Sequence, residues 1–81
     1  HIEKYGAEWC GPCRVLEKTL EQITDIDIVK YDVDEDSDLA AEKKIRSIPV
    51  LIFYNGDTEV DRLVGAVSLE TINQTIDKWR Q

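Results

Sequence analysis

The residues with the clearest capacity for chemistry are Cys10 and Cys13, the only two cysteines of the chain. They lie in the stretch Trp9-Cys10-Gly11-Pro12-Cys13, where a segment with helical periodicity begins. The start of a helix offers unpaired N–H groups and the positive end of the helix dipole, which stabilise a thiolate on the first cysteine. A thiolate attacks disulfides, and a second thiol at this spacing closes a small, reversible disulfide. We therefore expect this pair to carry out thiol–disulfide exchange.

A zinc half-site and a structural disulfide are the alternatives for these cysteines. Zinc sites usually use four ligands, and His1 is the single histidine of the chain. A disulfide across so short a loop removes little entropy from the unfolded chain. The alternating aspartates from Asp32 to Asp38 also fail as a calcium loop, because Ser37 and Lys43 stand where glycine and glutamate are needed. We expect no bound metal.

The size and the charge of the chain narrow its function class. It has 81 residues, 42% of them hydrophobic, and a net charge of -7. Such a chain forms one small globular domain, expected to span residues 1–81. The acidic excess argues against a nucleic-acid partner and against binding to an anionic membrane. The apolar runs are too short for a membrane span. We expect a cytoplasmic monomer whose cysteines do chemistry.

Hydrophobic periodicity predicts seven elements in the order βαβαββα. Strands are expected at 2–7, 26–33, 49–54 and 58–64, and helices at 11–23, 39–44 and from 69 to at least 79. The run 26–33 is rich in β-branched and aromatic residues and predicts a buried strand. Ser37 or Asp38 is expected to cap the second helix, and Ser68 the third. Asn55-Gly56 predicts a tight hairpin turn.

The order of the elements also limits the topology. Two strands joined through a helix are expected to be parallel, with a right-handed crossover. The last two strands form an antiparallel hairpin. The economical arrangement is an α/β fold with one mixed four-stranded sheet flanked by helices on both faces.

Taken in order, these motifs resemble the thioredoxin family. The resemblance rests on Ala7-Glu8-Trp9-Cys10-Gly11-Pro12-Cys13, Asp32-Val33-Asp34, Ile48-Pro49, Asn55-Gly56 and Val64-Gly65-Ala66. It covers nearly the whole chain. It implies a thioredoxin-like fold in its minimal βαβαββα form, without the extra strand and helix with which larger members of the family begin.

The resemblance implies a thiol-disulfide oxidoreductase that reduces protein disulfides. Cys10 would be the nucleophile and Cys13 the resolving cysteine. No cofactor would be bound, and electrons would reach the Cys10–Cys13 disulfide from a donor similar to thioredoxin reductase. Disulfide-containing proteins would be the partners. A glutaredoxin-like, glutathione-dependent reductase and a non-enzymatic docking subunit remain as alternatives.

The same resemblance assigns supporting residues around the cysteines. Trp9 would lie beside the sulfurs, Pro12 would stiffen the loop and help to set the reduction potential, and Gly11 would let a partner's backbone approach. The bond before Pro49 would be cis, although only about 5–6% of X–Pro bonds in folded proteins are. The expected substrate groove comprises Ile48, Pro49, Val64, Gly65 and Ala66.

Lys4 and Gly6 depart from the pattern of the family. Many members carry a buried aspartate six residues before the first cysteine, where this chain has Lys4, and Lys30 stands at the position of its partner lysine. Two neighbouring ammonium groups would favour a thiolate on Cys13. The alternative is that Lys4 extends outward into solvent. Gly6 replaces a second tryptophan of many members, which predicts looser packing beside the substrate.

Overall fold

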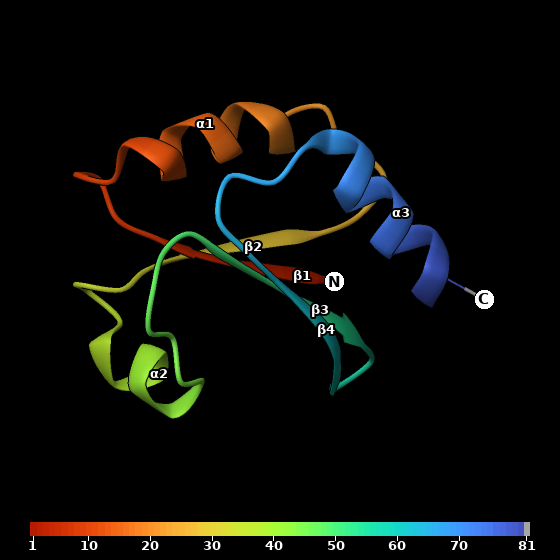
Figure 1. Cartoon of the computed structure of the whole chain (residues 1–81). Coiled ribbons are helices and arrows are strands. Elements are labelled where there is room, and N and C mark those ends of the chain that lie inside the picture. The colour runs from red at the N-terminus through yellow and green to blue at the C-terminus, as the bar shows by residue number, and fades with distance from the viewer. Residues whose placement is uncertain (81) are drawn as a thin grey trace.

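The computed structural model describes residues 1–80 and contains four strands and three helices (Figure 1). Along the chain they are β1 (Ile2–Gly6), α1 (Gly11–Leu20), β2 (Ile28–Asp32), α2 (Ser37–Glu42), β3 (Val50–Asn55), β4 (Thr58–Val64) and α3 (Leu69–Trp79). This is the predicted βαβαββα order, and each strand begins and ends within two residues of its predicted bounds.

The strands form one mixed sheet in the order β2-β1-β3-β4. β1 runs parallel to β2 and antiparallel to β3, and β3 and β4 form an antiparallel hairpin. Helices α1 and α3 cover one face of the sheet and α2 the other (Figure 1). The predicted thioredoxin-like architecture, a mixed sheet flanked by helices on both faces, is therefore confirmed.

The core between the sheet and helices α1 and α3 fixes the position of the cysteine helix. Its buried members are Ile2, Leu16, Leu20, Leu51, Phe53, Ile72 and Ile76. Cys13, Leu16 and Leu20 recur at helical spacing and are all buried, so they share one face of α1. Full burial of a leucine such as Leu16 contributes about 1.5–3 kcal/mol. Packing of that face therefore holds Cys13 against the sheet.

The opposite core is smaller, and the strand at its edge corrects a prediction. Tyr5, Val50 and Ile52 are buried on the face that α2 covers. β2 is not the buried strand that its composition predicts: Val29 is 40% exposed and Lys30 is exposed. The reason is its place at the edge of the sheet, next to β1.

Two helices differ from their predicted limits. α1 ends at Leu20, three residues early, because the chain turns there: the Gln22 N–H donates to the Thr19 carbonyl over 3.2 Å. α2 begins one turn after Asp32 and has Asp36 at its N-cap in place of Ser37 or Asp38. The Asp36 N–H donates to the Asp32 carbonyl over 2.8 Å, and this turn sets where the helix starts.

The hairpin turn is offset by one residue from its prediction. Asn55 is the last residue of β3 and pairs with Thr58, so the two-residue loop is Gly56-Asp57. Gly56 has a φ of 62°, a left-handed conformation that favours glycine. The sequence signal located the hairpin correctly, but the paired strand extends one residue further than expected.

The cap of α3 is confirmed. The Ser68 hydroxyl accepts a hydrogen bond from the Thr71 N–H over 3.1 Å. Trp79, at the other end, is 36% exposed, and its indole N–H donates to Asp61 over 3.0 Å. Within residues 1–80, no helix has the length and apolar character that crossing a membrane requires.

Candidate active site

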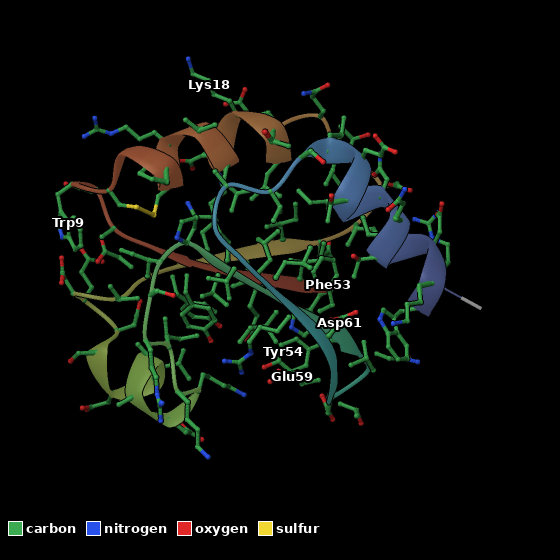
Figure 2. The ribbon with its side chains drawn as sticks, in the orientation of Figure 1. Trp9, Lys18, Phe53, Tyr54, Glu59 and Asp61 are labelled. Carbon is green, nitrogen blue, oxygen red and sulfur yellow. A yellow bond between two sulfur atoms is a disulfide. The ribbon has the colours of Figure 1, made fainter. Side chains whose placement is uncertain are left out.

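The two cysteines lie at the N-terminus of α1 and form a disulfide, drawn as the yellow bond in Figure 2. Cys10 is the N-cap residue, and its Sγ accepts a hydrogen bond from the Cys13 backbone N–H over 3.2 Å. Gly11 and Pro12 form the exposed start of the helix, where the missing N–H of proline costs no intrahelical bond. Cys10 is 5% exposed and Cys13 3% exposed. The site therefore combines a nearly buried sulfur pair with the donor end of a helix.

Segments distant in sequence meet beside the sulfurs. Ile48 packs against the cluster that contains both cysteines and Ala7. The Ile48–Pro49 peptide bond is cis, as the resemblance implied. The Gly65 N–H donates to the Pro49 carbonyl over 2.8 Å, and Gly65 has a φ of 94°. The loop before β3 and the loop after β4 therefore lie together at this end of the sheet.

Apolar side chains are exposed around this end of the molecule. Trp9 is 69% exposed and Val64 57% exposed, and Ala66 is also exposed, whereas Pro49 is fully buried. The Trp9 indole N–H donates to the Asp34 carboxylate over 2.9 Å, which holds the ring against the loop after β2. Trp9 and Val64 therefore present apolar surface to solvent at this end of the molecule.

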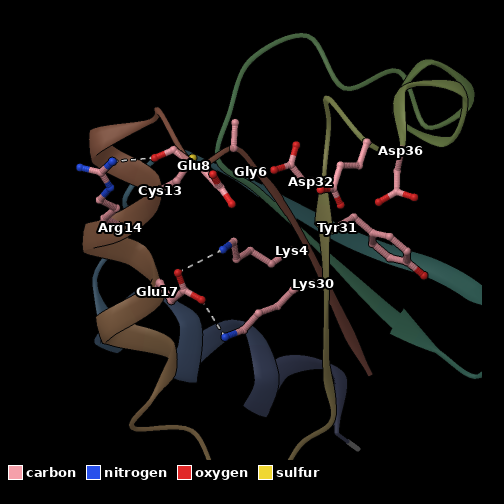
Figure 3. Close-up of a pocket in the computed structure, with 12 residues that line it drawn as sticks. Lys4, Gly6, Glu8, Cys13, Arg14, Glu17, Lys30, Tyr31, Asp32 and Asp36 are labelled. Atoms are coloured by element: carbon pink, nitrogen blue, oxygen red, sulfur yellow. Dashed lines mark hydrogen bonds and ion pairs between the residues drawn. The ribbon is translucent and has the colours of Figure 1, made fainter.

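Lys4 lies beneath the cysteines and does not extend into open solvent. It is 7% exposed, and its Nζ is 3.8 Å from Oε2 of Glu17 on α1. Lys30 donates to the other oxygen of Glu17 over 2.8 Å (Figure 3). The two lysines therefore share one carboxylate, and the outward orientation considered for Lys4 is wrong. Sequence reasoning missed Glu17, although a residue four positions after Cys13 shares its face of the helix.

The lysines act on the titration of Glu17. The hydrogen bond from Lys30, followed by the charges of Lys4 and Lys30, holds the pKa of Glu17 below its usual 4.5. Glu17 is therefore an anion across the neutral pH range. It offsets positive charge that would otherwise stand unopposed near Cys13.

A cavity of about 610 Å³ opens between α1 and β2, and Cys13 is one of its lining residues (Figure 3). Lys4, Gly6 and Glu17 line it together with Cys13. A Cβ at Gly6 would lie 3.2 Å from both Cys13 Sγ and Lys4 Cε. The absence of a side chain at Gly6 is therefore what lets the lysine and the sulfur approach each other.

The part of the chain from residue 1 to 80 places no three His, Cys, Asp or Glu side chains where they could hold a metal ion. Fold and site together define a dithiol–disulfide redox domain.

Comparisons with known proteins identify the family. The thioredoxin family model matches residues 1–78. Thioredoxin 1 from Nostoc sp. is 39% identical, in a match covering 91% of this chain and 74% of that protein. Thioredoxin-2 from Saccharomyces cerevisiae is 50% identical over 80% of this chain and 66% of its own length.

Solved structures agree with these relatives. A mutant thioredoxin from Halobacterium salinarum superposes with a TM-score of 0.91 at 30% identity, covering 99% of this chain and 74% of that one. A thioredoxin from Nicotiana alata gives a TM-score of 0.86 at 36% identity, covering 99% and 72%.

The chain belongs to the thioredoxin family. It is a thiol-disulfide oxidoreductase that acts on protein disulfides through a redox-active cysteine pair. Its partners are disulfide-containing proteins and a reductase that supplies electrons. These relatives give no support to the glutathione-dependent or docking alternatives.

Proposed function

We propose that Cys10 is the attacking nucleophile and Cys13 the resolving cysteine in the reduction of protein disulfides. The observation that carries this assignment is the place of Cys10 at the N-cap of α1, where its Sγ accepts the Cys13 N–H over 3.2 Å. In the reduced protein, the same donor and the helix dipole stabilise a Cys10 thiolate. Cys13, one turn into the helix, has no equivalent position.

The reaction then proceeds in two exchanges. The Cys10 thiolate attacks one sulfur of the substrate disulfide, so that a mixed disulfide forms and the other substrate sulfur leaves as a thiolate and takes a proton. Cys13 next loses its proton and attacks Cys10 Sγ. The Cys10–Cys13 bond forms, the mixed disulfide breaks, and the second substrate sulfur leaves. Two electrons from the reductase restore the dithiol.

The substrate groove is proposed to run over Ile48, Pro49, Val64, Gly65 and Ala66. Ile48 contacts the cysteine cluster, and its backbone lies just before the sheet ladder, which begins at Val50. An extended substrate segment pairs with that backbone while shallow apolar contacts come from Val64 and Trp9. Recognition through main-chain contacts suits an enzyme that meets many different disulfides.

The remaining assignments are proposals on the same footing. Gly11 leaves room for the substrate backbone, and Pro12 stiffens the cysteine loop and tunes its potential. Lys4 and Lys30 supply positive charge that favours a thiolate on Cys13. The protein works as a cytoplasmic monomer without a bound cofactor, and neither nucleic acid nor a membrane is a partner. The net charge of -7 supports the last point.

The test is reduction of the disulfides of insulin, with dithiothreitol and then glutathione as the electron donor. Strong stimulation by dithiothreitol, little by glutathione, and none in Cys10→Ser is the expected result. Efficient turnover with glutathione would assign the activity to the glutaredoxin class. No stimulation by either donor would overturn the proposed role as a reductant.

A further inference from the structure

Three charged side chains near Cys13 link α1 to the sheet through two ion pairs. Lys4 reaches from β1 to Glu17 on α1, and Lys30 reaches from β2 to the same carboxylate (Figure 3). Lys4 is 7% exposed, whereas the side chain of Lys30 is 52% exposed. The buried ammonium is therefore the less screened of the two, and it is the one that lies near the sulfur.

The distance between Lys4 and Cys13 is limited by the geometry at Gly6. The position of a Gly6 Cβ is 3.2 Å from Cys13 Sγ and equally far from Lys4 Cε, so those two atoms are at most twice that distance apart. The Lys4 Nζ is one bond further along and is directed to Glu17. Lys4 is therefore close enough to Cys13 for its charge to act on a thiolate there.

Glu17 itself is unsuited to take the proton of Cys13. Its pKa lies below 4.5 because of the hydrogen bond from Lys30 and the charge of Lys4. Glu17 is therefore ionised at neutral pH and does not keep a proton that it receives from Cys13. Cys13 lines a cavity of about 610 Å³ that opens to solvent, so the proton ends in bulk solvent.

We propose that Glu17 is a positioning residue that holds the Lys4 ammonium and so limits how strongly Lys4 stabilises the Cys13 thiolate. The inference rests on the proposed resolving role of Cys13. Once Cys13 has lost its proton to solvent, the thiolate attacks Cys10 Sγ and releases the substrate sulfur. Release of Lys4 from Glu17 would raise the fraction of thiolate and speed this step at neutral pH.

The size of the effect follows from Coulomb's law. One unit charge about 7 Å from a thiolate moves its titration midpoint by about half a pH unit in a water-like medium and by about 1.7 pH units near a protein surface. The other charged side chains that line the cavity are Glu8, Arg14, Lys30, Asp32, Glu35 and Asp36. Among them Glu35 is an exposed carboxylate, which makes Glu35→Gln a control with the same change of residue and charge.

The experiment uses the Cys10→Ser protein, in which Cys13 is the only thiol, and follows thiolate absorbance against pH. Glu17→Gln is expected to lower the Cys13 midpoint by at least about half a pH unit. Lys4→Met is expected to raise the Cys13 midpoint. When Glu17→Gln is added to Lys4→Met, the shift that it causes should be at most half of the shift that it causes alone. Glu35→Gln should shift the midpoint by less than half as much as Glu17→Gln.

Equal shifts from Glu17→Gln and Glu35→Gln would overturn the proposal, because the Cys13 midpoint would then depend only on the total charge around the cavity. A Glu17→Gln shift that persists in full with Lys4→Met would also overturn it, because the two residues would act independently. Lys4→Gln replaces Lys4→Met if that variant does not fold. The midpoint is measured without turnover, so a failed insulin assay would refute the proposed function and leave this result interpretable.

Discussion

Gly6→Ala adds one methyl group between β1 and Cys13. The new Cβ would lie 3.2 Å from Cys13 Sγ, 3.4 Å from Cys13 Cβ and 3.2 Å from Lys4 Cε. Lys4 is flexible and can give way, but Cys13 is bonded to Cys10 and lies on the buried face of α1. Overpacking of this kind costs about 1–3 kcal/mol. The reduced entropy of the unfolded chain returns about 0.4–1 kcal/mol. We expect a net loss of about 1 kcal/mol.

Urea or thermal unfolding of the oxidised protein measures this loss. For a domain of this size, about 1 kcal/mol corresponds to a Tm lower by about 4–8 °C. Gly11→Ala is the matched control, because a Cβ at Gly11 meets no atom within 4 Å and its backbone φ is not left-handed. That control should be neutral or stabilising. If Gly6→Ala stabilises the protein as much as Gly11→Ala does, the crowding inferred beside Cys13 is wrong.

Three further predictions concern the helices. Leu16→Ala empties a fully buried position and should cost about 2–5 kcal/mol in urea unfolding; a loss below 1 kcal/mol would contradict the assigned core. Ser68→Ala removes the hydroxyl that accepts the Thr71 N–H and should lower the free energy of unfolding by about 1 kcal/mol. An unchanged Tm would show that this hydrogen bond does not stabilise the protein. The pKa of Glu17 is lower in the folded protein than its unfolded value near 4.5. Its contribution to the free energy of unfolding is therefore fully present above that value and is lost as the pH falls through the folded pKa. Tm should therefore fall less between pH 6 and pH 3 in Glu17→Gln than in the parent, and identical pH profiles would contradict the ion pairs.

Most of the fold was predictable because local patterns and global packing agree. The continuous apolar run of β3 predicts a buried strand and Ser68 predicts a helix cap, and the structure contains both. The exposure of β2 was not predictable from its own residues, because Val29 and Tyr31 suit a buried strand equally well. Strand order decides exposure, and strand order depends on contacts between distant segments.

The candidate site was predictable where a motif places residues close in sequence. Cys10 and Cys13 fall at the start of a helix, as their spacing indicates. The environment of Lys4 was not predictable, because it depends on how α1 lies over β1 and β2. Lys4 and Lys30 suggested a pair of like charges, and the structure shows a carboxylate from the helix between them. That carboxylate, Glu17, carries no motif of its own.

The most direct test of the account is to trap the intermediate that its central claim requires. Cys13→Ser and Cys10→Ser, both reduced, are each mixed with a protein disulfide, and the adducts are weighed by mass spectrometry before and after dithiothreitol. The account predicts a stable, reducible mixed disulfide with Cys13→Ser, because Cys10 attacks and nothing resolves it, and no adduct with Cys10→Ser. An adduct that forms only with Cys10→Ser would contradict the assignment of Cys10 as the nucleophile.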